Sequence, residues 1–202
     1  MMPLKHIIRK ILKPVAGIGL IITVAGCVSL TSKAPPSLLV LTATKAVASG
    51  AQNTGNPSQA LVVLIPDVPR KIDTNRVPVQ VDASQIAYLK DAFWADKPAR
   101  LMQQLLSETI RAQSNRLVLT EVEAGGNAER TLSGNLMEFG IDAAKMEAVV
   151  IFEAVKMVRG KPVQTKRFER RAAISAILPA PSGAGLNQAA NAVAADIASW
   201  ME

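Results

Sequence analysis

The chain has 202 residues, of which 49% are hydrophobic and 19% are charged, with 23 basic and 16 acidic side chains. This composition excludes a disordered chain and indicates one folded domain with appendages. The single cysteine, Cys27, excludes an internal disulfide framework and a cysteine zinc site, and the single histidine, His6, lies near the N-terminus.

The first 26 residues have the composition of a secretory signal peptide. Four basic side chains and no acid precede an apolar run of 11 residues, Val15 to Ala25. A helix of that length rises only about 16 Å, which is too short to span a membrane. Without the four leader charges the chain keeps 19 basic and 16 acidic residues, a net charge of +3. Since no stripe of basic and aromatic side chains is present, we expect no nucleic-acid partner.

The leader ends in Val24-Ala25-Gly26-Cys27, which resembles the bacterial lipobox. We expect cleavage between Gly26 and Cys27 and acylation of the Cys27 thiol, because a thiolate can take a diacylglyceryl group as a thioether. Two or three chains such as palmitate would hold the protein on a membrane, at about 0.8 kcal/mol per buried methylene. Val28 stands where an Asp marks inner-membrane retention in enteric-type bacteria, which favours the inner leaflet of the outer membrane, facing the periplasm. The alternative is a plain secreted protein with an incidental cysteine.

Two segments follow the signal peptide, which spans residues 1–26. Residues 27–36 are expected to form the lipid anchor and a flexible tether, because Ser, Thr, Lys and a Pro-Pro pair resist helix formation. Residues 37–202 are expected to form the folded domain.

Apolar periodicity divides this domain into strands and two helices. Apolar side chains at helical spacing behind Pro98 predict an amphipathic helix of about 16 residues that ends near Ser114. A second helical stripe, rich in alanine, runs from Leu186 to Trp200. Because strands and helices do not alternate regularly, we predict an α+β domain, a largely antiparallel β-sheet with two α-helices packed on one face. Strands are predicted at residues 37–44, 60–65, 77–81, 86–88, 117–122, 131–139, 146–158 and 163–177.

Marker residues accompany these elements in a fixed order. They are Lys71-Ile72-Asp73-Thr74-Asn75-Arg76-Val77, Tyr88 ahead of Phe93-Trp94-Ala95-Asp96, Leu132-Ser133-Gly134-Asn135-Leu136 with Phe139, and the final Trp200. Together with the lipobox, this order resembles the ABC-type transport auxiliary lipoprotein family, which includes the PqiC-like lipoproteins, over residues 37–202. The first strand lacks the tyrosines often seen in that family, and the loop at 46–59 is long.

The resemblance implies a non-catalytic accessory to an ABC transporter that moves lipids between the inner and outer membranes. It also implies a partner, the periplasmic subunit of the transporter, which carries MCE domains. A second copy of the chain is a further candidate partner, and the membrane would be contacted through the acyl chains on Cys27. Two other interpretations stay open. One is a stand-alone envelope lipoprotein that scaffolds outer-membrane proteins or assists their assembly, and the other is an enzyme of unusual composition.

Conventional catalytic, metal and cofactor sites are not expected. With Cys27 acylated and no histidine after His6, the exported chain cannot assemble Ser-His or Cys-His catalysis, and a metal would need carboxylates alone. Glu121 and Glu123 alternate onto one face of a predicted strand, which is typical of a solvated surface. Residues 183–185, a Gly-Ala-Gly preceded by prolines, indicate a loop and not an anion site.

Two groups of side chains are candidates for partner binding. On one predicted strand, Arg167 and Arg171 face one way while Lys166 and Arg170 face the other. A sheet with one buried face cannot hide both pairs. We therefore expect either an edge strand protected by charge or a rim that meets an acidic partner or a second copy. Trp94, just before the first helix, either packs the helix entry onto the sheet or contacts a partner through an exposed part.

Overall fold

The computed structural model describes residues 37–114, 116–125 and 128–202, which all belong to one compact unit, Ala34–Glu202. The expected signal peptide and tether, with Gly26 and Cys27, lie outside the described residues. The helices described are η1 (Pro57–Gln59, a 3-10 helix), α1 (Pro98–Ser114), α2 (Glu121–Ala124) and α3 (Pro179–Met201). The strands described form one sheet and are β1 (Leu61–Val63), β2 (Arg76–Gln80), β3 (Ile86–Phe93), β4 (Val118–Leu119), β5 (Arg130–Asp142), β6 (Glu147–Val158) and β7 (Gln164–Ala173).

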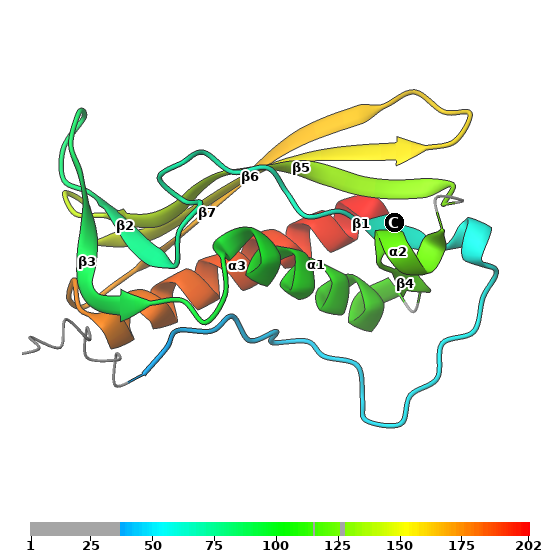
Figure 1. The fold of residues 1–202 in the computed structure, drawn as a ribbon, viewed down its shortest axis with the longest axis horizontal. Helices are drawn as coiled ribbons and strands as arrows, with labels where there is room; N and C mark the ends of the chain where they lie inside the picture. The colour runs from blue at the N-terminus through cyan, green and yellow to red at the C-terminus, as the bar shows by residue number, and fades with distance from the viewer. Residues whose placement is uncertain (1–36, 115, 126–127) are drawn as a thin grey trace, which may run out of the picture. The chain divides into compact units, whose positions relative to one another are not determined.

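The long strand β5 organises the sheet (Figure 1). β6 pairs antiparallel with β5 from Arg130, opposite Val158, to Asp142, opposite Glu147, and β7 pairs antiparallel with β6. On the other side of β5, β1 and β2 pair with it in parallel near opposite ends. β4 is parallel to β1, and β3 is antiparallel to β2. Because the long ladders are antiparallel and the parallel ones are short, the prediction of a largely antiparallel sheet in an α+β fold is confirmed.

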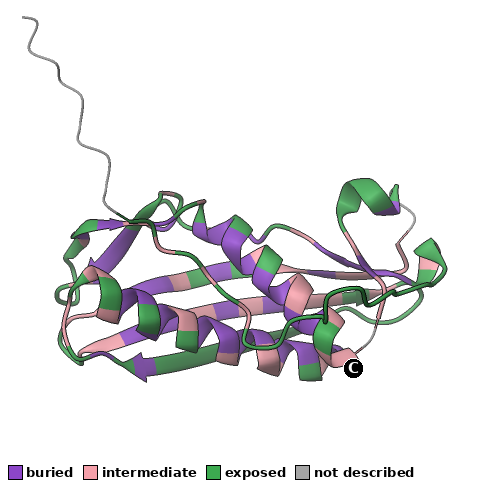
Figure 2. Cartoon of the chain, turned by 90° about the horizontal axis from the view of Figure 1, so that it is seen from below, coloured by how far each residue is buried: buried purple, intermediate pink, exposed green. Residues whose placement is uncertain are grey.

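Helices α1 and α3 pack on one face of the sheet, as predicted (Figure 1). Each turns an apolar stripe inward, and the buried positions recur along both helices in Figure 2. Leu105 of α1 is 3% exposed and Ile197 of α3 is fully buried. Small residues let α3 approach β6 and β7 closely, since a Cβ added at Gly185 would lie 2.6 Å from Cγ2 of Ile174.

The glycine in the middle of β5 marks a second close approach. A Cβ added at Gly134 would collide with the carbonyl oxygen of Glu153 on β6 and would lie 2.7 Å from the ring of Phe152. A side chain at this position would therefore push β5 and β6 apart. This contact gives a physical reason for the glycine in the Leu-Ser-Gly-Asn-Leu marker.

The predicted strand at 37–44 is largely wrong. Only Leu39 forms a bridge, to Trp94, and the segment then runs as an extended strap against α3. The amide of Asn191 holds the strap, because its oxygen accepts from the N–H of Thr44 at 2.8 Å and its nitrogen donates to the carbonyl of Thr42 at 2.9 Å. Side-chain amides thus satisfy backbone groups that a neighbouring strand would otherwise satisfy.

The predicted strand at 117–122 is interrupted after β4. Thr120 caps the short helix α2, and a capping box joins its hydroxyl and backbone to Glu123. Hydrogen bonds from the backbone and hydroxyl of Thr120 lower the pKa of the Glu123 carboxyl. Glu121 and Glu123 therefore lie in a helical turn and not on one strand face, which corrects the expectation from alternation.

The last helix begins earlier than expected, at Pro179. Its first turn contains Pro179 and Pro181, where the missing N–H groups cost nothing because those positions have no helical acceptor. Residues 183–185 are consequently helical and not a loop, with Gly183 and Gly185 buried. Gly183 leaves room for the strap, since a Cβ there would lie 2.7 Å from Cδ2 of Leu39.

Candidate partner-binding surface

Strand β7 is an open edge of the sheet, since β6 is its only strand partner among the described residues. Its four cations are exposed and divide between two faces as the alternation predicts. Lys166 and Arg170 lie on the side of α3, and Arg167 and Arg171 lie on the opposite side. The structure therefore brings the predicted basic residues together on one edge strand.

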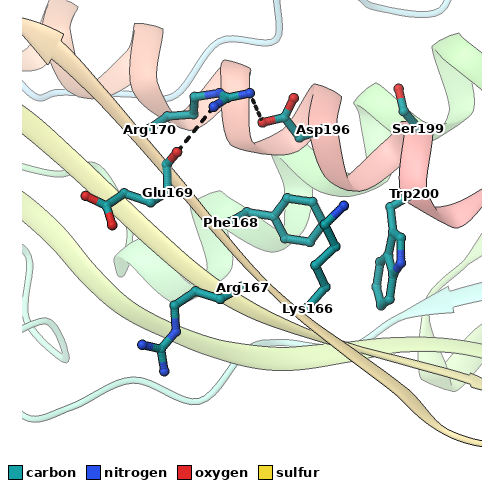
Figure 3. Close-up of a pocket in the computed structure, with 8 residues that line it drawn as sticks. All are labelled: Lys166, Arg167, Phe168, Glu169, Arg170, Asp196, Ser199 and Trp200. Atoms are coloured by element: carbon teal, nitrogen blue, oxygen red, sulfur yellow. Dashed lines mark hydrogen bonds and ion pairs between the residues drawn. The ribbon is translucent and has the colours of Figure 1, made fainter.

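On the helix side, Arg170 links the edge strand to α3 (Figure 3). Its Nη2 atom lies 2.6 Å from Oδ2 of Asp196, and its Nη1 atom donates to the carbonyl oxygen of Glu169 at 3.5 Å. Lys166 lies over the ring of Phe168, with Nζ 5.1 Å from the ring centroid. Lys166 has no salt bridge to an acidic side chain of the described residues. Its ammonium is therefore able to pair with an acidic group from outside the chain.

On the opposite face, acidic side chains of the chain itself pair with both arginines. Nη2 of Arg167 lies 2.8 Å from Oε2 of Glu153. The hydrogen bond to Glu169 is the main cause that raises the pKa of the Arg171 guanidinium. Three carboxylates surround Arg171, namely Glu169 at 2.7 Å, Glu147 at 3.3 Å and Asp142 at 3.4 Å. Arg171 therefore holds the edge strand to its neighbours as well as carrying charge.

A groove of about 620 Å³ lies between β7 and the last turns of α3 (Figure 3). Phe168 and Trp200 form its aromatic wall, with ring centroids 5.8 Å apart and ring planes at 61°. Phe168 is almost fully buried, whereas Trp200 is partly exposed. The rest of the lining is polar and consists of Lys166, Arg167, Glu169, Arg170, Asp196 and Ser199.

Beside this groove, the end of the β6–β7 hairpin forms a basic tip, defined here as Lys156, Arg159, Lys161 and Lys166. Nζ of Lys156 donates to the carbonyl oxygen of Trp200 at 2.9 Å and lies 5.5 Å from the indole centroid. Burial, and then the charges of Arg116, Arg130 and Lys161, lower the pKa of Lys156. None of the four cations of the tip has a salt bridge to an acid within the described ranges. Positive charge is therefore concentrated at this end of the groove.

Trp94 lies in the core, away from this surface. Its side chain is 1% exposed, and its ring centroid lies 5.1 Å from that of Phe139 on β5. The backbone N–H of Trp94 donates to the carbonyl of Asn75 at 2.7 Å, which fixes the chain just before α1. The expected exposed part is absent, because the indole fills the space between the sheet and the helix entry. The interpretation of Trp94 as a partner contact is therefore wrong.

The described residues show no other constellation with obvious chemistry. Among them, no group of three His, Cys, Asp or Glu side chains is arranged to hold a metal ion. In the same part of the chain, no helix is both long and apolar enough to cross a bilayer.

The sequence predicted the cations of β7 but not the groove beside them. Phe168 alternates with Lys166 and Arg170, so its place on the same face was readable once the strand was identified. Trp200 was recognised only as the end of an apolar helical stripe. Its contact with Phe168, and the pairing of Asp196 with Arg170, depend on α3 crossing the edge strand, which no local pattern encodes.

Comparison with known proteins gives one family match and several similar folds. The family model described as ABC-type transport auxiliary lipoprotein component matches residues 40–198. The crystal structure of protein XCC0632 from Xanthomonas campestris, of family DUF330, has a TM-score of 0.65 at 18% identity, covering 81% of this chain and 94% of that chain. The crystal structure of an uncharacterized protein has a TM-score of 0.63 at 17% identity, covering 72% of this chain and 93% of that one. None of the curated proteins matches the sequence significantly.

Proposed function

The chain belongs to the family of ABC-type transport auxiliary lipoprotein components, and we propose that it is a non-catalytic accessory of an ABC transporter that moves lipids between the inner and outer membranes. The family match, which extends across nearly the whole folded domain, is the observation that carries this proposal. The single histidine of the sequence lies in the leader, and this supports a role in assembly and not in turnover.

The proposed anchor is an acylated Cys27 in the inner leaflet of the outer membrane. The lipobox at the end of a short apolar run supports acylation, and Val28 supports the choice of membrane. Replacing Val28 by Asp should shift the protein to the inner-membrane fraction of a sucrose gradient. Recovery of the Val28→Asp protein in the outer membrane, at the level of the native protein, would contradict this placement.

The proposed partner is the periplasmic subunit of the transporter, with MCE domains, and the proposed contact surface is the edge of β7 with its groove and basic tip. A long edge strand that carries cations on both faces supports a protein contact, because complementary charge steers association and sets orientation. A homo-oligomer formed through another surface is the second assembly that we consider.

The experiment is co-purification of the full-length protein from its native membranes after mild crosslinking. We expect the permease, the ATPase and the MCE-domain subunit to be recovered with it. Recovery of outer-membrane proteins without any transporter component would contradict the proposal and favour the stand-alone scaffold. Light scattering of the purified protein in detergent then determines whether it associates with itself.

A further inference from the structure

The open edge of β7 presents regularly spaced backbone groups for hydrogen bonding. The N–H of Ile174 donates to the carbonyl of Met146 at 2.9 Å, and these two residues continue the β6–β7 register. In an antiparallel ladder every second residue bonds to its partner strand, so the even-numbered residues of β7 bond to β6. The N–H and C=O groups of the alternate residues therefore point away from β6, toward the open side, at Thr165, Arg167, Glu169, Arg171 and Ala173.

The edge lacks the usual structural protections. β7 extends over Gln164–Ala173 without a proline, and its register with β6 has no bulge. The charged side chains of β7 are what protects this edge against uncontrolled strand pairing. Arg170 covers one of the outward carbonyls, that of Glu169, but at 3.5 Å this hydrogen bond is long (Figure 3). The edge is thus able to accept another strand.

The groove accepts the side chains that such a strand would bring. A strand added to β7 would direct every second side chain to the side of α3. There it would meet Phe168 and Trp200, which provide an apolar wall, and Lys166, which has no acidic partner in the described chain. An apolar side chain opposite Phe168 and an acidic one opposite Lys166 match this surface.

A second copy of β7 fits the edge poorly. An antiparallel pair centred on Phe168 would set Lys166 of one copy directly opposite Arg170 of the other, twice. In the same register Arg167 would face Glu169, but these two side chains already pair with Glu153 and Arg171 within each copy. Like charges that face each other across a strand pair are destabilising. The other cations of the basic tip, Lys156, Arg159 and Lys161, add positive charge beside Lys166, which favours an acidic strand instead.

The surface lies at the end of α3 opposite to the point where the described chain begins. The strap enters the domain beside Gly183, near the start of α3, where it packs through Leu39. Trp200 and the basic tip lie at the other end of α3, about 25 Å further along a helix that rises 1.5 Å per residue. The groove is thus far from the end of the domain at which the anchored segment enters.

We infer that the edge of β7 binds an extended, acidic protein segment by strand addition, with one apolar side chain of that segment held in the groove against the aromatic wall that Trp200 and Phe168 form. The segment would form backbone hydrogen bonds with the outward groups of β7, and its carboxylates would pair with Lys166 and the other cations of the basic tip. The inference deepens the proposed function, on which it rests, by stating how the partner is held.

The test uses full-length protein in nanodiscs of zwitterionic lipid and a fluorescent peptide of about ten residues with several glutamates and a central leucine. Two further peptides carry N-methyl groups on alternate amides, one on the odd set and one on the even set. Since an added strand bonds through one set only, one methylated peptide should bind as the parent does, and the other should bind at least about tenfold more weakly. A peptide with lysines in place of the glutamates should bind more weakly than the parent.

A pair of variants at one position tests the edge itself. Thr165→Pro removes an outward N–H while the bonds of the neighbouring residues to β6 remain, whereas Thr165→Ala keeps the N–H. The proline variant should lose at least about tenfold in affinity for the parent peptide, and the alanine variant should not. If Thr165→Pro fails to fold, the comparison of the two N-methylated peptides still tests strand addition.

Three outcomes would overturn the inference. They are equal binding of the two methylated peptides, binding of the lysine peptide as tight as that of the parent, and binding of anionic vesicles at the basic tip with no peptide binding. None of these experiments contains a transporter subunit. Failure of strand addition while the subunit still co-purifies would therefore leave the proposed function in place.

Discussion

The indole ring of Trp200 stands edge-on to the ring of Phe168, with their centroids 5.8 Å apart. This contact joins the last turn of α3 to the edge strand, and the hydrogen bond from Lys156 to the carbonyl of Trp200 reinforces it. Edge-to-face aromatic pairs contribute about 0.5 to 1.5 kcal/mol beyond the area that they bury. The groove therefore depends on the docking of α3 onto β7.

The packing of α1 on the sheet is tested by Leu105→Ala. We expect the free energy of unfolding to fall by about 2 to 5 kcal/mol, because the side chain is buried in the core. Gln104→Ala, at an exposed position of the same helix, should change the free energy of unfolding by less than about 0.5 kcal/mol. Urea denaturation measures both variants, and equal small losses would show that α1 does not pack as described.

The close approach of β5 and β6 predicts that Gly134→Ala destabilises the fold. The added methyl group meets the carbonyl oxygen of Glu153, so the strands must separate, and we expect a loss of about 1 to 3 kcal/mol. Asn135→Ala, the next residue and exposed, is the matched control. Thermal unfolding of the two proteins compares them directly, and an unchanged midpoint for Gly134→Ala would be inconsistent with this contact.

Lys156 should make stability depend on pH with a definite sign. Burial and neighbouring cations lower its pKa in the folded protein, so the unfolded chain binds this proton more tightly. The contribution of Lys156 to the free energy of unfolding should therefore rise as the pH increases from below the lowered pKa toward the ordinary value of 10.5. Urea unfolding of the native protein and of Lys156→Gln is measured from about pH 8 upward. The free energy of unfolding of the native protein should increase relative to that of the variant as the pH rises. A difference that stays constant or shrinks would disprove this assignment, and Lys90→Gln, at an exposed position of β3, serves as the control.

Acylation at Cys27 is tested by metabolic labelling with a fatty-acid analogue. The native protein should carry the label, and Cys27→Ser should carry none and should accumulate in an uncleaved or soluble form. Label retained on the Cys27→Ser protein would exclude this residue as the lipidation site.

Regular apolar periodicity made part of the fold predictable. The helix from Pro98 to Ser114 and the β2–β3 and β6–β7 hairpins follow from local spacing, and the structure confirms them. The start of α3 could not be predicted from local spacing, because Pro179 and Pro181 are typical of loops unless they occupy the first turn of a helix. The strap could not be predicted in this way either, because its backbone is held by Asn187 and Asn191, which are far away in the sequence.

The candidate site was also predictable only in part, because several of its side chains contact residues that are far away in the sequence. Alternation along β7 placed the four cations on two faces without knowledge of their neighbours. Apart from Glu169 on β7 itself, the acidic partners of the three arginines lie on β5, β6 and α3, so the sequence did not reveal that Arg167 and Arg171 are already paired. Replacing both arginines by Glu would place new carboxylates beside those that now pair with Arg167 and Arg171 and would lower stability, so Lys166 is the better position for a charge reversal.

The central proposal is that the protein binds a periplasmic transporter subunit through the edge of β7. The most direct measurement is the affinity of the purified full-length protein for the purified MCE-domain subunit, at low and high salt. Native protein is compared with Lys166→Glu and with Lys90→Glu, an exposed control on β3. We predict binding that weakens with salt, falls at least about tenfold for Lys166→Glu and is unchanged for Lys90→Glu. Absence of binding at low salt, or equal binding by all three proteins, would contradict the account.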